Sequence, residues 1–192
     1  MAKAGQDTRQ HIVAAADRLF YERGYEATSF ADIAGAVGLS RGNFYYHFRA
    51  KDEILVAVIA ERHRARETML AAWEAEEPTP AARIARFFRI LIDNQAKIMA
   101  HGCHVGTLCV ELAKLKHPAQ GEAAAVLALF RDWLARQFVA LGREAEADAL
   151  ALHVLMRSQG VATLAATFRD EAFVRREVAD FDGWLSALGP PA

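Results

Sequence analysis

Residues 29–48 read Ser-Phe-Ala-Asp-Ile-Ala-Gly-Ala-Val-Gly-Leu-Ser-Arg-Gly-Asn-Phe-Tyr-Tyr-His-Phe and contain two short helical patterns separated by a turn. Ser29 followed by Asp32 three residues later forms a capping box that predicts a helix start, and Gly38 predicts its end. Ser40 is then expected to cap the second helix. Two short helices joined by a tight turn that contains glycine are typical of a helix-turn-helix.

The apolar and polar residues of this segment are predicted to lie on opposite faces. The expected inner face is apolar and consists of Ile33, Ala34, Val37, Leu39, Phe44 and Phe48. The outer face and first turn of the second helix then carry Arg41, Gly42, Asn43, Tyr46 and His47. Arginine can donate to both acceptors of a guanine edge, asparagine can bond to both the acceptor and the donor of an adenine edge, and a glycine lets the helix approach a duplex closely. The alternative is a small structural bundle in which Tyr45 and Tyr46 are interface aromatics.

The distribution of charge agrees with nucleic-acid binding, although the formal net charge is only −1. No acid lies between Ile33 and Lys51, whereas Arg41, Arg49 and Lys51 do. A local basic patch on a slightly acidic body is sufficient to attract phosphate.

The rest of the chain has helical periodicity and almost no strand signal, so the fold class is predicted to be all-α with about nine helices. A first helix is expected over 7–22 and a fourth over 51–75. The linker Glu76–Pro80 follows. Further helices are expected over 81–100, 103–116, 119–141, 144–168 and 171–188.

The stretch from Thr8 to Lys51 resembles the N-terminal domain of the TetR family of regulators. The residues that carry the resemblance are Ala27-Thr28-Ser29, Asp32-Ile33-Ala34, Gly38-Leu39-Ser40-Arg41-Gly42, Phe44-Tyr45-Tyr46-His47-Phe48 and Lys51. The resemblance implies a DNA-binding domain over 1–50 and a helical effector-binding and dimerisation domain over 51–192. It implies base-edge contacts from Arg41, Gly42 and Asn43, and backbone contacts from Ser29, Ser40, Tyr45, Tyr46, His47 and Lys51.

Members of this family are generally homodimers that bind palindromic double-stranded DNA operators, and most are repressors released by a small-molecule effector. Here the resemblance implies dimerisation through the last two long helices, over 144–168 and 171–188. The residues themselves agree, because the first of these helices is apolar around much of its girth and must be buried on several sides.

The segment from His101 to Leu112 is similar to a subgroup of TetR-like repressors that respond to electrophiles and reactive aldehydes. Cys103 is expected in the first turn of a helix near two histidines, an environment that favours thiolate. Cys103, His104 and Thr107 are therefore the predicted effector-sensing residues. The alternative is that Cys103 and Cys109 are small buried apolar residues.

The sequence offers residues for two other kinds of effector site. The first is a pocket for a non-covalent ligand. Its predicted lining consists of the apolar residues Phe87, Phe88, Leu91, Met99, Phe130, Trp133 and Met156. Such residues at helical spacing also build ordinary cores. A metal site built from His101, Cys103, His104 and Cys109 is disfavoured, since the two cysteines lie on different helix faces and no third exists.

No nucleophile–base set, glycine-rich phosphate loop or paired metal-ligand motif is present, so neither enzymatic activity nor a cofactor is expected. The alternatives are an enzyme, or a helical small-molecule-binding protein that does not bind DNA. The sequence shows no apolar leader or membrane-spanning stretch, and two cysteines are too few for a disulfide framework. A cytoplasmic protein without membrane contact is therefore expected.

Overall fold

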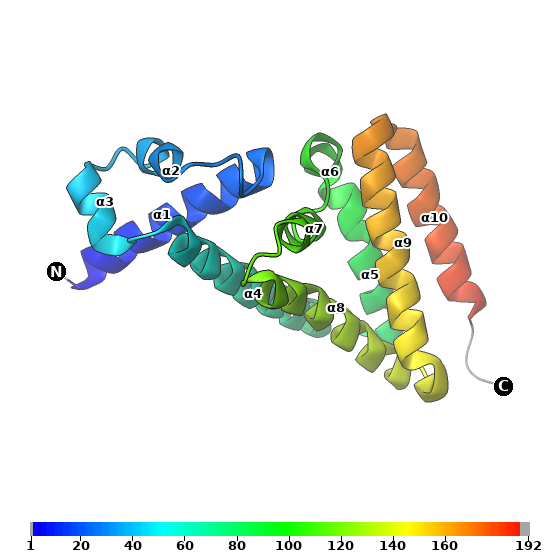
Figure 1. The fold of residues 1–192 in the computed structure, drawn as a ribbon. Helices are drawn as coiled ribbons and strands as arrows, with labels where there is room; N and C mark the ends of the chain where they lie inside the picture. The colour runs from blue at the N-terminus through cyan, green and yellow to red at the C-terminus, as the bar shows by residue number, and fades with distance from the viewer. Residues whose placement is uncertain (1, 189–192) are drawn as a thin grey trace. The chain divides into compact units, whose positions relative to one another are not determined.

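The computed structural model describes the backbone of residues 2–188 and the side chains of residues 7–40 and 42–188. Every regular element among these residues is helical, which confirms the predicted all-α class (Figure 1). The chain divides into two compact units. The first extends up to Arg64 and includes Thr107–Val126, and the second comprises Ala65–Gly106 and the residues from Leu127 onward.

The first unit contains α1 (Ala2–Arg23), α2 (Phe30–Ala36), α3 (Arg41–His47), the first half of α4 (Lys51–Glu76) and α7 (Gly106–Lys114) apart from its first residue. Its core is built from the apolar stripe of α1, which includes Ile12, Ala16 and Phe20, together with Ile54 and Leu55 of α4, all nearly or fully buried. Arg62 is also buried in this unit, and its Nε donates to Asp17 Oδ1 at 2.6 Å. A buried guanidinium of this kind needs such a partner, because an uncompensated buried charge is costly.

The second unit contains the rest of α4, α5 (Pro80–Asp93), α6 (Gln95–His101), most of α8 (Gln120–Ala140), α9 (Ala147–Phe168) and α10 (Glu171–Ala187). A short 3-10 helix, Glu144–Glu146, precedes α9. Helices α5, α9 and α10 pack side by side (Figure 1). The rings of Phe88 and Phe181 stack at 3.9 Å between α5 and α10, and the Arg157 guanidinium lies 5.8 Å from both ring centres.

The helix predicted over 81–100 is wrong in one respect, because it is broken into α5 and α6 at Asn94. The Asn94 side-chain amide donates to Ile90 O at 3.1 Å and so competes for a carbonyl of its own helix. Short polar side chains that bond to nearby backbone groups disfavour a continuous helix.

The helix predicted over 103–116 is also corrected, since α7 begins only at Gly106. Gly102 ends α6 with a φ of 79°, a left-handed conformation that glycine adopts without strain. Cys103 and His104 therefore lie in the turn between α6 and α7 rather than in a helix. The division of function between 1–50 and 51–192 stays a prediction, and the compact units divide the chain elsewhere.

Candidate functional site

The helix-turn-helix forms around a buried inner face. Ile33 of α2 and Phe44 of α3 are fully buried, and Phe48, directly after α3, is 2% exposed. The ring of Phe44 meets the ring of Phe30 edge-on at 4.7 Å, and the Arg9 guanidinium lies over Phe48 at 4.6 Å. Such edge-to-face pairs contribute about 0.5–1.5 kcal/mol beyond their buried area. These contacts fix which face of α3 is turned away from the protein.

Both short helices start at the serines that the sequence predicted as caps. Ser29 Oγ accepts from Asp32 N at 3.0 Å, and Asp32 Oδ2 accepts from Ser29 N at 2.8 Å, which completes the capping box. Ser29 Oγ also donates to Asp32 Oδ2 at 2.6 Å, and these bonds lower the pKa of Asp32. Ser40 Oγ accepts from Asn43 N at 3.4 Å. Ser29 can therefore donate to a phosphate only if its N–H or its hydroxyl gives up the hydrogen bond to Asp32.

The outer face of α3 carries most of the residues predicted to contact DNA. Gly42 and Asn43 are exposed, and Tyr46 is 83% exposed. Tyr45 is 43% exposed with its ring against Phe30, and the half-buried His47 meets the Tyr46 ring edge-on at 5.2 Å. A Cβ on Gly42 would meet nothing within 4 Å, so packing inside the protein does not explain this glycine. The side chain of Arg41 lies outside the described residues.

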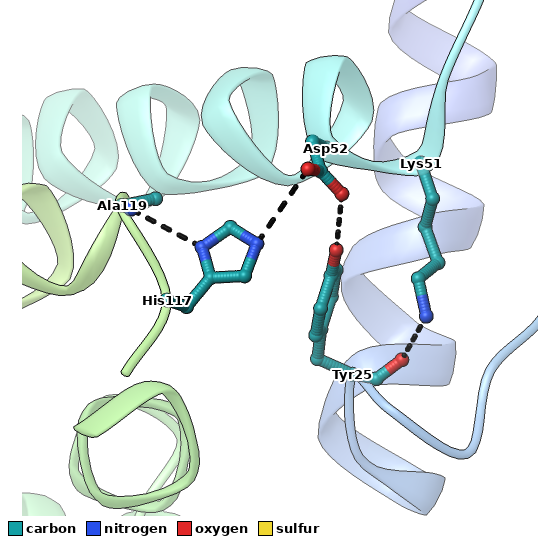
Figure 2. A network of polar contacts seen from close by, with 5 residues as sticks. All are labelled: Tyr25, Lys51, Asp52, His117 and Ala119. Carbon is teal, nitrogen blue, oxygen red and sulfur yellow. Dashed lines mark hydrogen bonds and ion pairs between the residues drawn. The ribbon is translucent and has the colours of Figure 1, made fainter. Parts of the chain in front are cut away.

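Lys51 differs from the other predicted DNA contacts because its ammonium is engaged within the protein. Lys51 Nζ donates to Tyr25 O at 2.9 Å and lies 4.1 Å from the centre of the Tyr25 ring (Figure 2). An ammonium has three donors, so this contact leaves capacity for a phosphate. The phosphate contact stays a prediction, and Lys51 also has a structural role in the turn after α1.

Sequence reasoning missed the polar network around Tyr25, which Figure 2 shows. Tyr25 Oη donates to Asp52 Oδ1 at 2.5 Å, and the nearest oxygen of Asp52 lies 3.8 Å from His117 Nε2. Burial and this hydrogen bond raise the pKa of the Tyr25 hydroxyl well above its ordinary value. The only local signal was a tyrosine directly after the helix-ending Gly24, and nothing local pointed to His117.

The Cys103 turn belongs to the second unit and surrounds the sulfur with donors. Cys103 Sγ accepts from Gly106 N and from Gln159 Nε2, each at 3.4 Å. His104 Nδ1 lies 3.1 Å from Arg66 Nη2. Gly106 is buried, and a methyl group there would overlap the Gln159 amide oxygen. The sulfur thus takes the place of a cap oxygen before α7, with its side chain half-buried.

Thr107, the third predicted sensing residue, lies in the first unit and is exposed in the first turn of α7. Cys109, which was not among the predicted sensing residues, is half-buried with its Sγ donating to Ala123 O at 3.3 Å. Cys109 therefore has the packed environment expected of a structural cysteine. Among the described residues, no group of three or more His, Cys, Asp and Glu side chains is arranged to hold a metal ion.

The residues predicted to line an apolar pocket are only partly brought together. Phe87 lies 5.3 Å from Phe130 and 6.4 Å from Trp133 between ring centres. Phe88 instead stacks on Phe181, and Met156 is 65% exposed on α9. Leu91 is buried, and Met99 is half-buried.

None of the described helices combines the length and the apolar character needed to cross a bilayer.

An all-α chain with this motif and this outward face defines a class, the helix-turn-helix regulatory proteins. Residues 12–58 match the family model described as bacterial regulatory proteins, tetR family. The repressor DhaR of Mycobacterium sp. (strain GP1) is 29% identical over 130 residues, which cover 66% of this chain and 61% of DhaR. The repressor NemR of Escherichia coli (strain K12) is 27% identical over 109 residues, which cover 56% of this chain and 53% of NemR.

Solved structures extend the similarity over nearly the whole chain. A TetR transcriptional regulator from Legionella pneumophila superposes with a TM-score of 0.81 at 25% identity, covering 92% of this chain and 96% of that one. The matches to DhaR and NemR span about half to three-fifths of those proteins. Residues 12–58 thus carry the helix-turn-helix domain of the TetR family, which confirms the resemblance that the helix-turn-helix residues predicted.

Proposed function

We propose that this protein is a transcriptional repressor that binds a palindromic operator as a homodimer and is released by a small-molecule or thiol-reactive effector. The observation that carries the proposal is the orientation of α3. Phe44 and Phe48 hold the helix to the protein, whereas Gly42, Asn43 and Tyr46 are exposed and no packing requirement explains them. DhaR and NemR, two of the relatives, are repressors.

In this proposal the base edges are contacted by Arg41, Gly42 and Asn43. The backbone phosphates are contacted by Ser29, Ser40, Tyr45, Tyr46, His47 and Lys51. Arginine and asparagine can each form two hydrogen bonds with a single base edge in the major groove, whereas hydroxyl, imidazole and ammonium groups suit phosphate oxygens. The absence of acids between Ile33 and Lys51 keeps this surface attractive to a polyanion.

The test of DNA binding is a gel shift on the DNA upstream of the protein's own gene at several salt concentrations. The logarithm of the association constant is expected to fall linearly with the logarithm of the salt concentration, because phosphate contacts release counterions. Arg41→Ala is expected to relax sequence preference, whereas Arg131→Ala at an exposed position of α8 is expected to leave it unchanged. Absence of retention at every salt concentration with folded protein contradicts the proposal.

The homodimer is supported by an exposed apolar face on α9. Leu152, Met156, Leu164 and Phe168 are 48%, 65%, 43% and 70% exposed, in two pairs spaced four residues apart. Between them, the hydroxyls of Thr163 and Thr167 donate to carbonyls of their own helix, so they present no unpaired donor. An exposed apolar patch of this kind marks an interaction site. In α10, by contrast, the apolar residues Val174, Val178, Phe181 and Leu185 are buried within the same chain, so the part of α10 in the dimer rests on the family resemblance.

Met156→Glu places a charge in the middle of this face and is expected to convert the dimer to a monomer, measured by light scattering after gel filtration. The matched control is Val110→Glu, since Val110 is 57% exposed on α7. If the Met156 variant remains a dimer, the interface does not include this face of α9.

The thiol-reactive signal is assigned to Cys103. Hydrogen bonds donated to Sγ by Gly106 and Gln159 suit a thiolate, the form of cysteine that adds to electrophiles. A structure of NemR is described as its reduced form and has the same fold as this chain, with a TM-score of 0.77 at 19% identity. Alkylation of Cys103 removes both hydrogen bonds and adds bulk beside the buried Gly106.

N-ethylmaleimide tests this assignment in the operator gel shift. Wild type and Cys109→Ser are expected to be released by the reagent, and Cys103→Ser is expected to stay bound. Unchanged release of the Cys103 variant removes the assignment. The effector is then a non-covalent ligand, and the aromatic cluster of Phe87, Phe130 and Trp133 becomes the first place to search.

A further inference from the structure

The turn between α1 and α2 is held by a carboxylate from a distant part of the first unit. Glu111 on α7 accepts hydrogen bonds from Tyr25 N through Oε2 and from Glu26 N through Oε1, each at 2.9 Å. The two oxygens of one carboxylate thus bind two successive backbone amides. Charge-assisted bonds of this kind are stronger than neutral ones.

Gly24 provides the space for this carboxylate. Its φ is +93°, in the left-handed region that favours glycine. A Cβ at this position would lie 3.0 Å from Glu111 Oε1 and 3.4 Å from Oε2. The backbone conformation therefore favours glycine here, and any side chain at this position would push against the Glu111 carboxylate.

The other side of the turn is fixed through Tyr25, which is 5% exposed. Its hydroxyl donates to Asp52 at the start of α4, and its carbonyl accepts from Lys51 Nζ (Figure 2). Its ring meets the ring of His117, just beyond α7, edge-on at 5.2 Å. Side chains from α4 and from the α7 region thus meet at one residue of the α1–α2 turn.

Glu111 is well placed to transmit a signal along the chain. It lies in the second turn of α7, and α7 begins three residues after Cys103. The backbone therefore connects the Cys103 turn to Glu111 over only eight positions. The hydrogen bonds from Glu111 in turn end at Tyr25 and Glu26, directly before the helix-turn-helix begins at Ser29.

We propose that Glu111 is a positioning residue that couples α7 to the helix-turn-helix. While its carboxylate binds Tyr25 N and Glu26 N, the α1–α2 turn is fixed and α3 is set for the operator. When α7 shifts, these bonds are lost and operator affinity falls. The proposal rests on the proposed DNA-binding function.

The experiment compares the Glu111→Gln variant with the wild type and with two controls. An amide side chain has one acceptor oxygen in place of two, so one of the two backbone amides loses its partner. Glu122→Gln on the exposed start of α8 controls for charge. Asp17→Asn controls for stability, because it weakens the buried Arg62 ion pair in the same unit away from the turn.

Three quantities are measured for each protein: amide exchange at Tyr25 and Glu26, operator affinity, and the thermal unfolding midpoint. Glu111→Gln is expected to exchange faster at these two amides and to lose about tenfold in operator affinity, a typical coupling between sites. Asp17→Asn is expected to lower the unfolding midpoint at least as much and to keep its operator affinity. Equal operator affinity of Glu111→Gln and wild type overturns the proposal, as does an equal affinity loss in Asp17→Asn.

A second arm treats each protein with N-ethylmaleimide. If Glu111 transmits the signal, alkylated wild type and untreated Glu111→Gln show the same fast exchange at Tyr25 and Glu26, and the reagent weakens the variant's operator binding no further. Full additional release of Glu111→Gln overturns the coupling. A wild type that binds no operator refutes the proposed function instead, and a wild type that binds but ignores the reagent refutes only the role of Cys103.

Discussion

The outer face of α3 and the Cys103 turn differ in how far the protein's own packing explains their residues. On α3, Gly42, Asn43 and Tyr46 are exposed, and a side chain at Gly42 would meet nothing. In the Cys103 turn, the sulfur accepts two hydrogen bonds, and the adjacent Gly106 leaves room for Gln159. Function is easier to infer where folding leaves a residue unexplained. The cysteine has a structural explanation as well, so only its reactivity can separate the two roles.

The largest expected effect separates the two faces of α3. Phe44→Ala removes a fully buried ring and is expected to destabilise the protein by about 3–5 kcal/mol. Tyr46→Ala, two residues away and 83% exposed, is expected to change stability by less than about 0.5 kcal/mol. Urea unfolding followed by circular dichroism measures both.

The gel shift completes this comparison. Tyr46→Ala is expected to weaken operator binding although the protein remains folded. Large destabilisation by Tyr46→Ala means that the ring packs against the protein, and the distinction between inner and outer face is then lost.

The next effect concerns sequence discrimination by the outer face. Asn43→Ala is expected to cost about 1–3 kcal/mol of discrimination for each half-site, since asparagine can bond to both groups of an adenine edge. Asn94→Ala, an exposed asparagine of the second unit, is the matched control and should leave discrimination intact. Competition gel shifts with single-base operator variants give the values. Equal loss of affinity on every sequence reassigns Asn43 to the phosphate backbone.

A smaller effect tests why α3 contains a glycine. Gly42→Ala and Gly35→Ala both add a methyl group that meets nothing within 4 Å on a short helix. Each is expected to stabilise the protein by up to about 1 kcal/mol, because alanine favours the helix over glycine. Only Gly42→Ala is expected to weaken operator binding. If both variants bind equally well, Gly42 does not lie at the duplex.

Local signals explain why the helix-turn-helix could be predicted from the sequence. Ser29 with Asp32, Ser40, and the Phe44–Phe48 spacing each act within a few residues, and the structure keeps all three. The hydrogen bond from Tyr25 N to the Glu111 carboxylate could not be predicted in this way, because it joins residues 86 positions apart. The break at Asn94 was missed because its side chain competes with a pattern that is otherwise continuous.

The position of Cys103 shows the same limit on a shorter scale. The residues after Gly102 have a helical pattern, but α7 starts only at Gly106, whose N–H donates to Cys103 Sγ. The same sulfur accepts from Gln159, which lies 56 positions away and which no local pattern could indicate. The predicted location in a first helical turn was therefore wrong by three residues, although the sulfur still lies at the start of the helix.

The smallest expected effect concerns the cap of α2. Two hydrogen bonds donated by Ser29 hold the pKa of Asp32 below its ordinary value of 3.8, and the one from the hydroxyl contributes more than the one from the backbone N–H. Because the folded pKa is lower than the unfolded one, the carboxylate stabilises the protein fully above the unfolded pKa, and this stabilisation is lost as pH falls through the folded value. The difference in unfolding midpoint between wild type and Asp32→Asn should be constant above about pH 5 and shrink below about pH 4.

Ser29→Ala removes the hydroxyl and should raise the pKa of Asp32 toward 3.8, as followed by NMR titration of its carboxyl carbon. The same titration with operator bound bears on the outer face. If a phosphate takes the donors of Ser29, the pKa of Asp32 rises because the bonds that lowered it are lost. If operator leaves the pKa of Asp32 unchanged, Ser29 serves only as a cap, and the phosphate contacts of the helix-turn-helix then come from Ser40, α3 and Lys51.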